Sequence, residues 1–171
     1  MTKAMIAACL LMITAGVTGC GGFLHEGPTN QRIKDTTGLT VAEAGATVEH
    51  NFELIWPRKG PVEIANLTLP GTGCRTNPNS LMSEGPPWRP RYTREQVNPS
   101  PEFIDQAMAN LAAMTARGFT LVPSQRPDND PVNRLYRDPA GYTVASSRDT
   151  SVGPRNEVRF SMTASAPCAA E

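Results

Sequence analysis

Residues 100–118 read SPEFIDQAMANLAAMTARG, and this stretch decides the fold prediction because it carries both ends and one apolar face of a helix. Ser100 is a favoured N-cap residue, and Pro101 suits the first helical position. Gly118 is typical of the residue that follows a helix in a left-handed conformation. Apolar side chains recur at helical spacing at Phe103, Ile104, Ala107, Met108, Leu111 and Met114. The sequence therefore predicts an amphipathic helix with one face on a core.

The residues that follow predict antiparallel strands. Short apolar runs occupy 119–122, 132–137 and 142–147. The last two runs flank Asp138-Pro139-Ala140-Gly141, which matches a type I turn and predicts a hairpin. In 157–165 apolar and polar residues alternate strictly, as in a strand with one face on the core.

The segment 40–56 is ambiguous between helix and strand. Thr40 and Glu43 have the spacing of a capping box, and apolar residues then recur at helical intervals. The end of the segment also alternates as a strand would, yet a helix over its first part is favoured. Residues 61–69 predict a short strand that leads to Cys74. The fold class predicted is α+β in two layers, with an antiparallel sheet of about four strands and one or two packed helices.

The N-terminus has the pattern of an export signal. Lys3 precedes an apolar run that is too short for a transmembrane helix, which needs about 20 apolar residues. The run ends in Val17-Thr18-Gly19-Cys20, which resembles the lipobox of bacterial lipoproteins. That resemblance implies cleavage after residue 19 and a lipid on Cys20. We expect a signal peptide at 1–19, a lipidated flexible tether at 20–39 and a single α+β domain at 40–171, anchored to the outer face of the cell membrane.

Composition excludes some partners. Removing the first 19 of 171 residues leaves 152, a length typical of one domain. The remaining chain has 15 basic and 16 acidic residues, because the leader carries one Lys and no acid. Nucleic-acid-binding domains normally show a basic excess. We therefore expect contact with the membrane through the lipid and with an unidentified envelope protein or ligand, but not with nucleic acid.

The cysteines predict one disulfide. Cys9 lies in the leader and Cys20 would carry the lipid, so Cys74 and Cys168 remain. An exported domain folds in an oxidising compartment, where such a pair is expected to form a bridge. A metal pair or a reactive thiol is the alternative, but two Cys residues without a nearby His make a poor zinc site.

A proline-rich segment offers the best candidate for partner binding. Residues 84–101 contain five prolines and therefore predict an irregular or polyproline-like loop. The candidate binding residues within it are Trp88, Arg89, Arg91, Tyr92 and Arg94. Guanidinium and aromatic groups together are typical of binding hot spots. The alternative is a solvent-exposed loop whose Trp88 covers the edge of the core.

No motif predicts catalysis, a metal or a cofactor. The two histidines are His25, in the expected tether, and His50, and no hydrolase motif surrounds either. The acidic run at 128–130 lacks the spacing of a calcium-binding loop and predicts a solvated turn. The sequence thus predicts a protein that is not an enzyme.

The order of features is lipobox, tether, first Cys, amphipathic helix ending in Gly118, hairpin with Gly141-Tyr142, last strand and second Cys. This order resembles the small LppA-like lipoproteins of actinobacteria and their phages, and it implies no particular activity. The leading hypothesis is an envelope lipoprotein that binds a partner. The alternatives are a prophage-encoded superinfection-exclusion lipoprotein and an accessory factor or enzyme of envelope metabolism.

Overall fold

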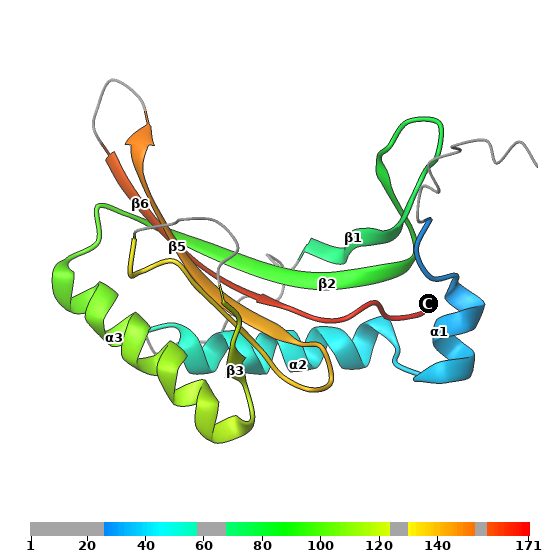
Figure 1. Ribbon diagram of the computed structural model, residues 1–171, viewed down its shortest axis with the longest axis horizontal. Coiled ribbons are helices and arrows are strands. Elements are labelled where there is room, and N and C mark those ends of the chain that lie inside the picture. The colour runs from blue at the N-terminus through cyan, green and yellow to red at the C-terminus, as the bar shows by residue number, and fades with distance from the viewer. Residues whose placement is uncertain (1–25, 58–67, 124–129, 153–156) are drawn as a thin grey trace, which may run out of the picture.

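The computed structural model describes residues 26–57, 68–123, 130–152 and 157–171 (Figure 1). Its helices are α1 Asn30–Thr36, α2 Val41–Ile55 and α3 Pro101–Ala113, the last extended by the 3-10 turn η2 Met114–Arg117. Its strands are β1 Thr68–Thr76, β2 Ser83–Val97, β3 Thr120–Leu121, β4 Arg134–Arg137, β5 Thr143–Val152 and β6 Glu157–Ser165. The α+β class is confirmed, but the sheet has six strands in place of the four or so predicted.

The six strands form one antiparallel sheet in the order β1-β2-β6-β5-β4-β3. Figure 1 shows α2 and α3 on the same side of this sheet, which is curved so that its ends rise away from the helices. None of the described helices is long and apolar enough to span a bilayer.

Helix α2 resolves the ambiguity of 40–56 in favour of a helix. The Glu43 backbone N–H donates to the Thr40 hydroxyl at 3.3 Å, and the Glu43 carboxylate accepts from the Thr40 N–H at 3.1 Å, so the capping box is complete. The Glu43 carboxylate also accepts from the Thr40 hydroxyl at 2.7 Å, and this bond, followed by the one from the Thr40 N–H, lowers the pKa of Glu43. The residues buried completely along the helix are Ala44, Val48, Phe52 and Ile55. Their spacing matches a helical face and not a strand.

Helix α3 and the strands after it confirm the predictions. The Ser100 hydroxyl caps α3 by accepting from the Phe103 N–H, and Gly118 ends η2 with a φ of 88°. Gly141 donates to the Asp138 carbonyl at 3.1 Å in the turn between β4 and β5. In β6, Phe160, Met162 and Ala164 are fully buried. They pack with α2 and α3 in a single hydrophobic core.

Strand β2 contradicts the prediction of an irregular loop at 84–101. The proline-rich residues 83–97 form a strand that pairs with β1 on one side and with β6 on the other. The prolines lie where the β1 ladder is irregular: residues 85–87, with Pro86 and Pro87, fall between the pairs Gly73–Trp88 and Arg75–Glu84. Pro90 lies at a second irregularity, and its carbonyl accepts from the Ala166 N–H. A missing N–H is tolerated at such positions because no regular ladder bond is lost.

The described part of the expected tether is not irregular throughout. Residues 30–36 of it form α1, which is capped by Thr29 and buries Ile33. The Glu26 carbonyl accepts from the Thr76 N–H at 3.0 Å, so the chain is already bound to the end of β1 at residue 26. Residues 26–36 of the expected tether therefore include a helix and a backbone hydrogen bond to β1.

Candidate functional site: the open face of the sheet

The open face of the sheet is the side opposite α2 and α3, and strand alternation determines its side chains. Residues directly opposite one another in paired strands point to the same side. Three cross-strand rows on β2, β6 and β5 therefore share the open face: Arg91–Ser165–Thr143, Thr93–Thr163–Ala145 and Glu95–Ser161–Ser147. Arg137 of β4 extends the first row because it pairs with Thr143.

Hydroxyl groups link the strands across this face. The Thr93 and Thr163 hydroxyls lie 2.9 Å apart, and the Ser147 and Ser161 hydroxyls lie 2.8 Å apart. Each hydroxyl can donate one hydrogen bond and accept two, so these pairs keep capacity for a ligand. The open face is thus a preorganised array of hydroxyl groups.

A groove of about 350 Å³ runs along the first two rows. Its lining includes two arginines and several hydroxyl residues: Thr72, Arg89, Arg91, Thr143, Ser147, Ser161, Thr163 and Ser165. None of the described residues that line it carries a carboxylate. Among the described residues, Arg91 has no ion-pair partner. This end of the open face therefore offers guanidinium and hydroxyl donors to an anionic or acceptor-rich group.

The other end of the open face has a different charge pattern. A second hollow, lined by Glu95, Asp149, Arg159 and the two paired serines, adjoins the groove. Here Arg159 lies 3.3 Å from Glu95 and 3.6 Å from Glu157, so its positive charge is balanced. The open face is therefore electrostatically asymmetric, and the arginine end is the one suited to an anion.

The five predicted binding residues do not form one cluster, because β2 sends alternate side chains to opposite sides. Arg89 and Arg91 lie on the open face and line the groove. Tyr92 is 4% exposed and packs edge-on against Phe52, with the two ring centroids 4.3 Å apart. Arg94 lies over the Trp56 ring at 5.0 Å, on the helix side.

Trp88 has a structural position at the chain terminus. Its Nε1–H donates to the Glu171 carboxylate at 2.8 Å, and its backbone pairs with Ala169. A Cβ at Gly85 would collide with the Trp88 ring, so the ring lies directly on that glycine. Trp88 therefore holds the C-terminal segment on β2.

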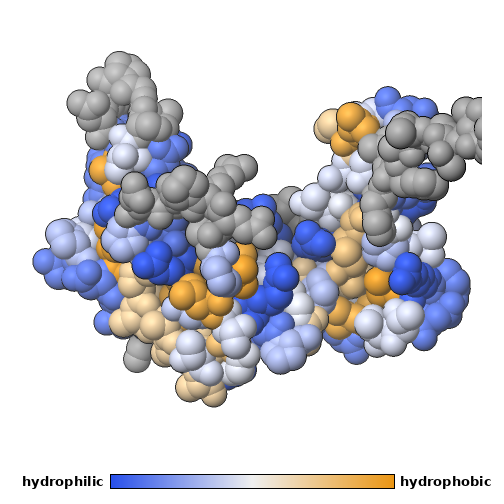
Figure 2. Space-filling view, in the orientation of Figure 1, coloured by the Kyte–Doolittle hydropathy of each residue, from blue (hydrophilic) through white to orange (hydrophobic). Residues whose placement is uncertain are grey.

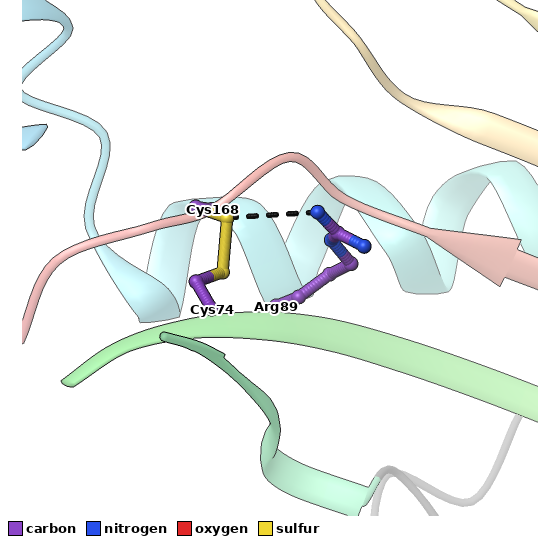
Figure 3. The surroundings of a disulfide bond; sticks show 3 residues. All are labelled: Cys74, Arg89 and Cys168. Atoms are coloured by element: carbon purple, nitrogen blue, oxygen red, sulfur yellow. Dashed lines mark hydrogen bonds between the residues drawn. A yellow bond between two sulfur atoms is a disulfide. The ribbon is translucent and has the colours of Figure 1, made fainter. Parts of the chain in front are cut away.

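The predicted disulfide is present next to the arginine end (Figure 3). Cys74 of β1 is bonded to Cys168 of the C-terminal segment, with the Cα atoms 6.0 Å apart. An Nη of Arg89 lies 3.7 Å from the Cys168 sulfur. The bridge therefore fixes the edge of the sheet beside the groove and helps to orient one of its two arginines.

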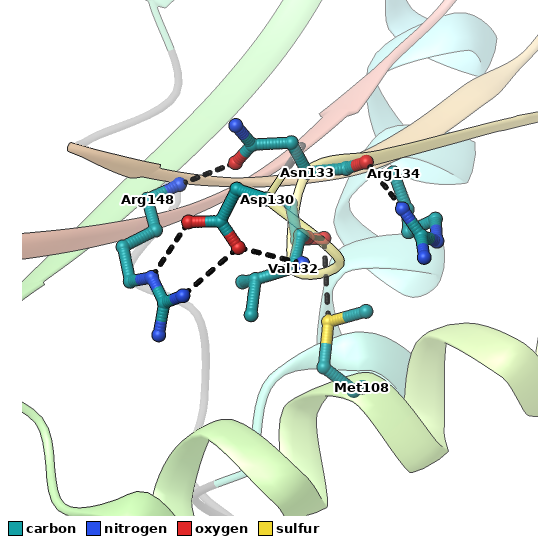
Figure 4. Close-up of polar contacts among 7 residues, drawn as sticks. Met108, Asp130, Val132, Asn133, Arg134 and Arg148 are labelled. Atoms are coloured by element: carbon teal, nitrogen blue, oxygen red, sulfur yellow. Dashed lines mark hydrogen bonds and ion pairs between the residues drawn. The ribbon is translucent and has the colours of Figure 1, made fainter. Parts of the chain in front are cut away.

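Asp130 forms an ion pair with Arg148 (Figure 4). Its carboxylate accepts from Nε and Nη2 of Arg148 at 2.8 and 2.9 Å, and from the Val132 N–H at 2.9 Å. Partial burial alone would raise the pKa of Asp130, but these bonds and the Arg148 charge lower it below its usual value. Asp128 and Asn129 lie outside the described residues.

Other candidate chemistry is limited within the described ranges. No group of three His, Cys, Asp or Glu side chains there could hold a metal ion. His50 is exposed on α2, and His25 lies outside the described part of the chain.

The sequence contains a pattern that indicates the open face, but the prolines of β2 make it hard to recognise. Polar and apolar residues alternate through β6, at Arg159, Ser161, Thr163 and Ser165, and over residues 89–93 of β2, whereas residues 93–96 are all polar. The β6 pattern predicts a half-buried strand, whereas the five prolines of 84–101 favour a loop and make the alternation in β2 hard to recognise. The described residues define an α+β domain with a polar sheet surface that helices α2 and α3 do not cover. Searches against protein-family models, curated proteins and solved structures give no match to this chain.

Proposed function

We propose that this chain is a lipid-anchored lipoprotein of the cell envelope, and that its domain is a non-enzymatic binding module. The anchor is Cys20, in the lipobox-like Val17-Thr18-Gly19-Cys20. Two acyl chains on this residue hold a protein stably at a membrane, where one chain is marginal. The domain then displays its open face in the envelope.

The observation that carries the binding role is the groove at the arginine end of the open face. Guanidinium groups form strong, charge-assisted hydrogen bonds to carboxylate and phosphate groups. Arg89 and Arg91 flank the groove together with hydroxyl donors, and among the described lining residues there is no carboxylate that would compete with the ligand. The partner is accordingly an envelope component that presents an anionic group at this surface.

The binding role is tested by photo-crosslinking in the native envelope, followed by identification of the captured partner. The Arg91→Ala variant should lose most of the crosslinked product, since Arg91 has no other charged partner among the described residues. Arg117→Ala is the matched control, because Arg117 is exposed at the end of η2, in the helix layer. Equal capture by the two variants would exclude the open face as the binding surface.

The anchor is tested separately. Cys20→Ser should move the protein from the membrane fraction to the soluble fraction, because the acyl chains can no longer be attached. Intact-mass measurement of the wild type should show the added lipid on a chain that begins at Cys20. Unchanged partitioning of the variant would contradict the proposal.

A further inference from the structure

The tip of the β1–β2 hairpin exposes two adjacent large apolar side chains. Leu81 is 64% exposed and Met82 is 68% exposed. The other large hydrophobics exposed in the described chain are Val97, at 42%, and Leu121, at 51%, and each stands alone in the sequence. Figure 2 shows hydrophobic colour at this raised tip. Scattered apolar residues are normal on protein surfaces, but an apolar pair at a protruding tip needs an explanation.

The tip is an ordered turn. The Leu81 N–H donates to the Asn77 carbonyl at 2.8 Å, and the Asn77 N–H donates to the Met82 carbonyl at 2.9 Å. The Asn77 side chain accepts from the N–H groups of Asn79 and Ser80. These bonds hold the two apolar side chains outward in one arrangement.

Leu81 occupies a conformation that costs free energy for its residue type. Its φ is 58°, in the left-handed region that glycine and asparagine adopt readily and bulky residues avoid. Leu81 is mostly exposed, so its burial in the folded domain offsets little of this cost. An exposed leucine at such a position is explained if its side chain is buried against something outside the domain.

The tip carries no charge that would oppose transfer into an apolar environment. Residues 76–83 include no Asp, Glu, Lys or Arg. The flanking charges are bonded at the base of the hairpin: Arg75 pairs with Glu26 at 3.3 Å, and Glu84 accepts from the Asn77 amide at 3.0 Å. Burying Leu81 and Met82 would therefore leave these ionic groups in place.

The chain that leads to the lipid is bound to the base of the same hairpin. The Glu26 carbonyl accepts from the Thr76 N–H. Gly27 follows with a φ of 82°, and a Cβ there would collide with the Cys74 carbonyl, so this close approach requires glycine. Cys20 lies six residues before Glu26. Six extended residues span at most about 20 Å, which keeps the hairpin close to the lipid.

We propose that Leu81 and Met82 insert into the interfacial region of the lipid bilayer and form a second membrane contact beside the Cys20 anchor. This inference rests on the proposed lipid anchor. The acyl chains supply attachment, and the hairpin tip fixes how the domain is oriented on the surface, because two separate contacts restrict its rotation. The bilayer is the partner we assign to these side chains, because the short connection to Cys20 keeps the tip of the hairpin near it.

The test uses the lipidated full-length protein reconstituted into phosphatidylcholine–phosphatidylglycerol vesicles, with or without brominated acyl chains. Leu81→Trp places a fluorophore at the tip, and Leu121→Trp places one at an exposed leucine of β3, the opposite edge strand of the sheet. Trp56 and Trp88 are present in both variants, so their emission is a shared background. Met82→Trp is made in parallel and takes the place of Leu81→Trp if that variant misfolds.

Brominated lipid should quench most of the emission added by Leu81→Trp and shift its spectrum to the blue, while the emission added by Leu121→Trp should be unchanged. Equal quenching of the two variants in protein that floats with the vesicles would overturn the hairpin contact and leave the anchor intact. Protein that fails to float with the vesicles would instead overturn the anchor. A protein partner on Leu81 and Met82 would leave both spectra insensitive to bromine, which also contradicts the inference.

Discussion

The two faces of the sheet are built from the same strands, yet their side chains differ in burial and in polarity. Toward the helices, β6 presents Phe160, Met162 and Ala164, all fully buried. Toward the open face, the same strand presents Ser161, Thr163 and Ser165, all half-buried and polar. Burial of apolar area stabilises the fold, whereas uncovered hydroxyl and guanidinium groups contribute little to it. Strand alternation therefore places the buried apolar side chains of β6 on one face of the sheet and its polar side chains on the other.

The strongest test of this comparison is Phe160→Ala. Removing a fully buried phenylalanine side chain leaves a cavity, so we expect a loss of about 3–5 kcal/mol in the free energy of unfolding. Urea denaturation of the Cys20→Ser form, followed by far-UV circular dichroism, measures this loss. Thr163→Ala on the open face is the matched control and should cost about 1 kcal/mol, the value of one exchanged hydrogen bond. Similar losses at the two positions would break the distinction between the faces.

The disulfide tests how much the edge of the sheet depends on a covalent link. Cys74 and Cys168 are 94 residues apart, so their bridge restricts a long loop in the unfolded chain. Replacing both with Ala should cost about 2–5 kcal/mol in unfolding free energy, measured by the same urea titration. Reduced wild-type protein should show a comparable loss. A double variant as stable as the oxidised wild type would show that burial alone holds β1 and the C-terminal segment.

A smaller effect is expected from the ion pair between Asp130 and Arg148. Arg148 lies on the helix-facing side of β5, two residues beyond the buried Val144 and Ser146. Its ion pair with Asp130 therefore lies at the edge of the hydrophobic core. Asp130→Asn should cost about 1.5–3 kcal/mol at neutral pH, the range for hydrogen bonds to charged groups. In a double-mutant cycle with Arg148→Gln, the double variant should lose less unfolding free energy than the sum of the losses in the two single variants. Strict additivity would show that the pair contributes no coupling energy.

The same pair predicts a pH dependence. The folded state lowers the pKa of Asp130, so its contribution to stability is complete above the ordinary carboxyl pKa of about 3.9 and is lost as pH falls toward the lowered value. Wild-type protein should therefore lose more unfolding free energy between neutral pH and about pH 3 than Asp130→Asn does. Urea titrations at both pH values measure the difference. An identical loss in the two proteins would contradict the assignment.

The smallest effect on stability is expected at Arg91, where the effect on binding is largest. Its side chain is exposed and makes no ion pair among the described residues, so Arg91→Ala should change the unfolding free energy by less than about 0.5 kcal/mol. The same variant should lose partner capture. A variant that loses stability together with binding would mean that the open face also supports the fold.

Caps, turns and strand alternation in the sequence specify much of the local structure of this domain. Thr40 with Glu43 specified the start of α2, and Ser100 with Gly118 specified both ends of α3 and η2. The turn at 138–141 and the strand β6 could also be predicted, because caps, turns and the strand period depend on residues that are neighbours in sequence. The pairing of Cys74 with Cys168 followed from there being two cysteines left in the domain.

The tertiary structure alone decided that 83–97 is a strand and that its arginines line a groove. Prolines oppose a regular ladder, so the local sequence favoured a loop, and only the irregular register of β1 accommodates Pro86, Pro87 and Pro90 within the sheet. Once β2 is a strand, alternation sends Tyr92 into the core and leaves Arg89 and Arg91 on the face that α2 and α3 do not cover. The pairing of β2 with β6 joins segments that are distant in sequence, and local propensities do not predict such contacts.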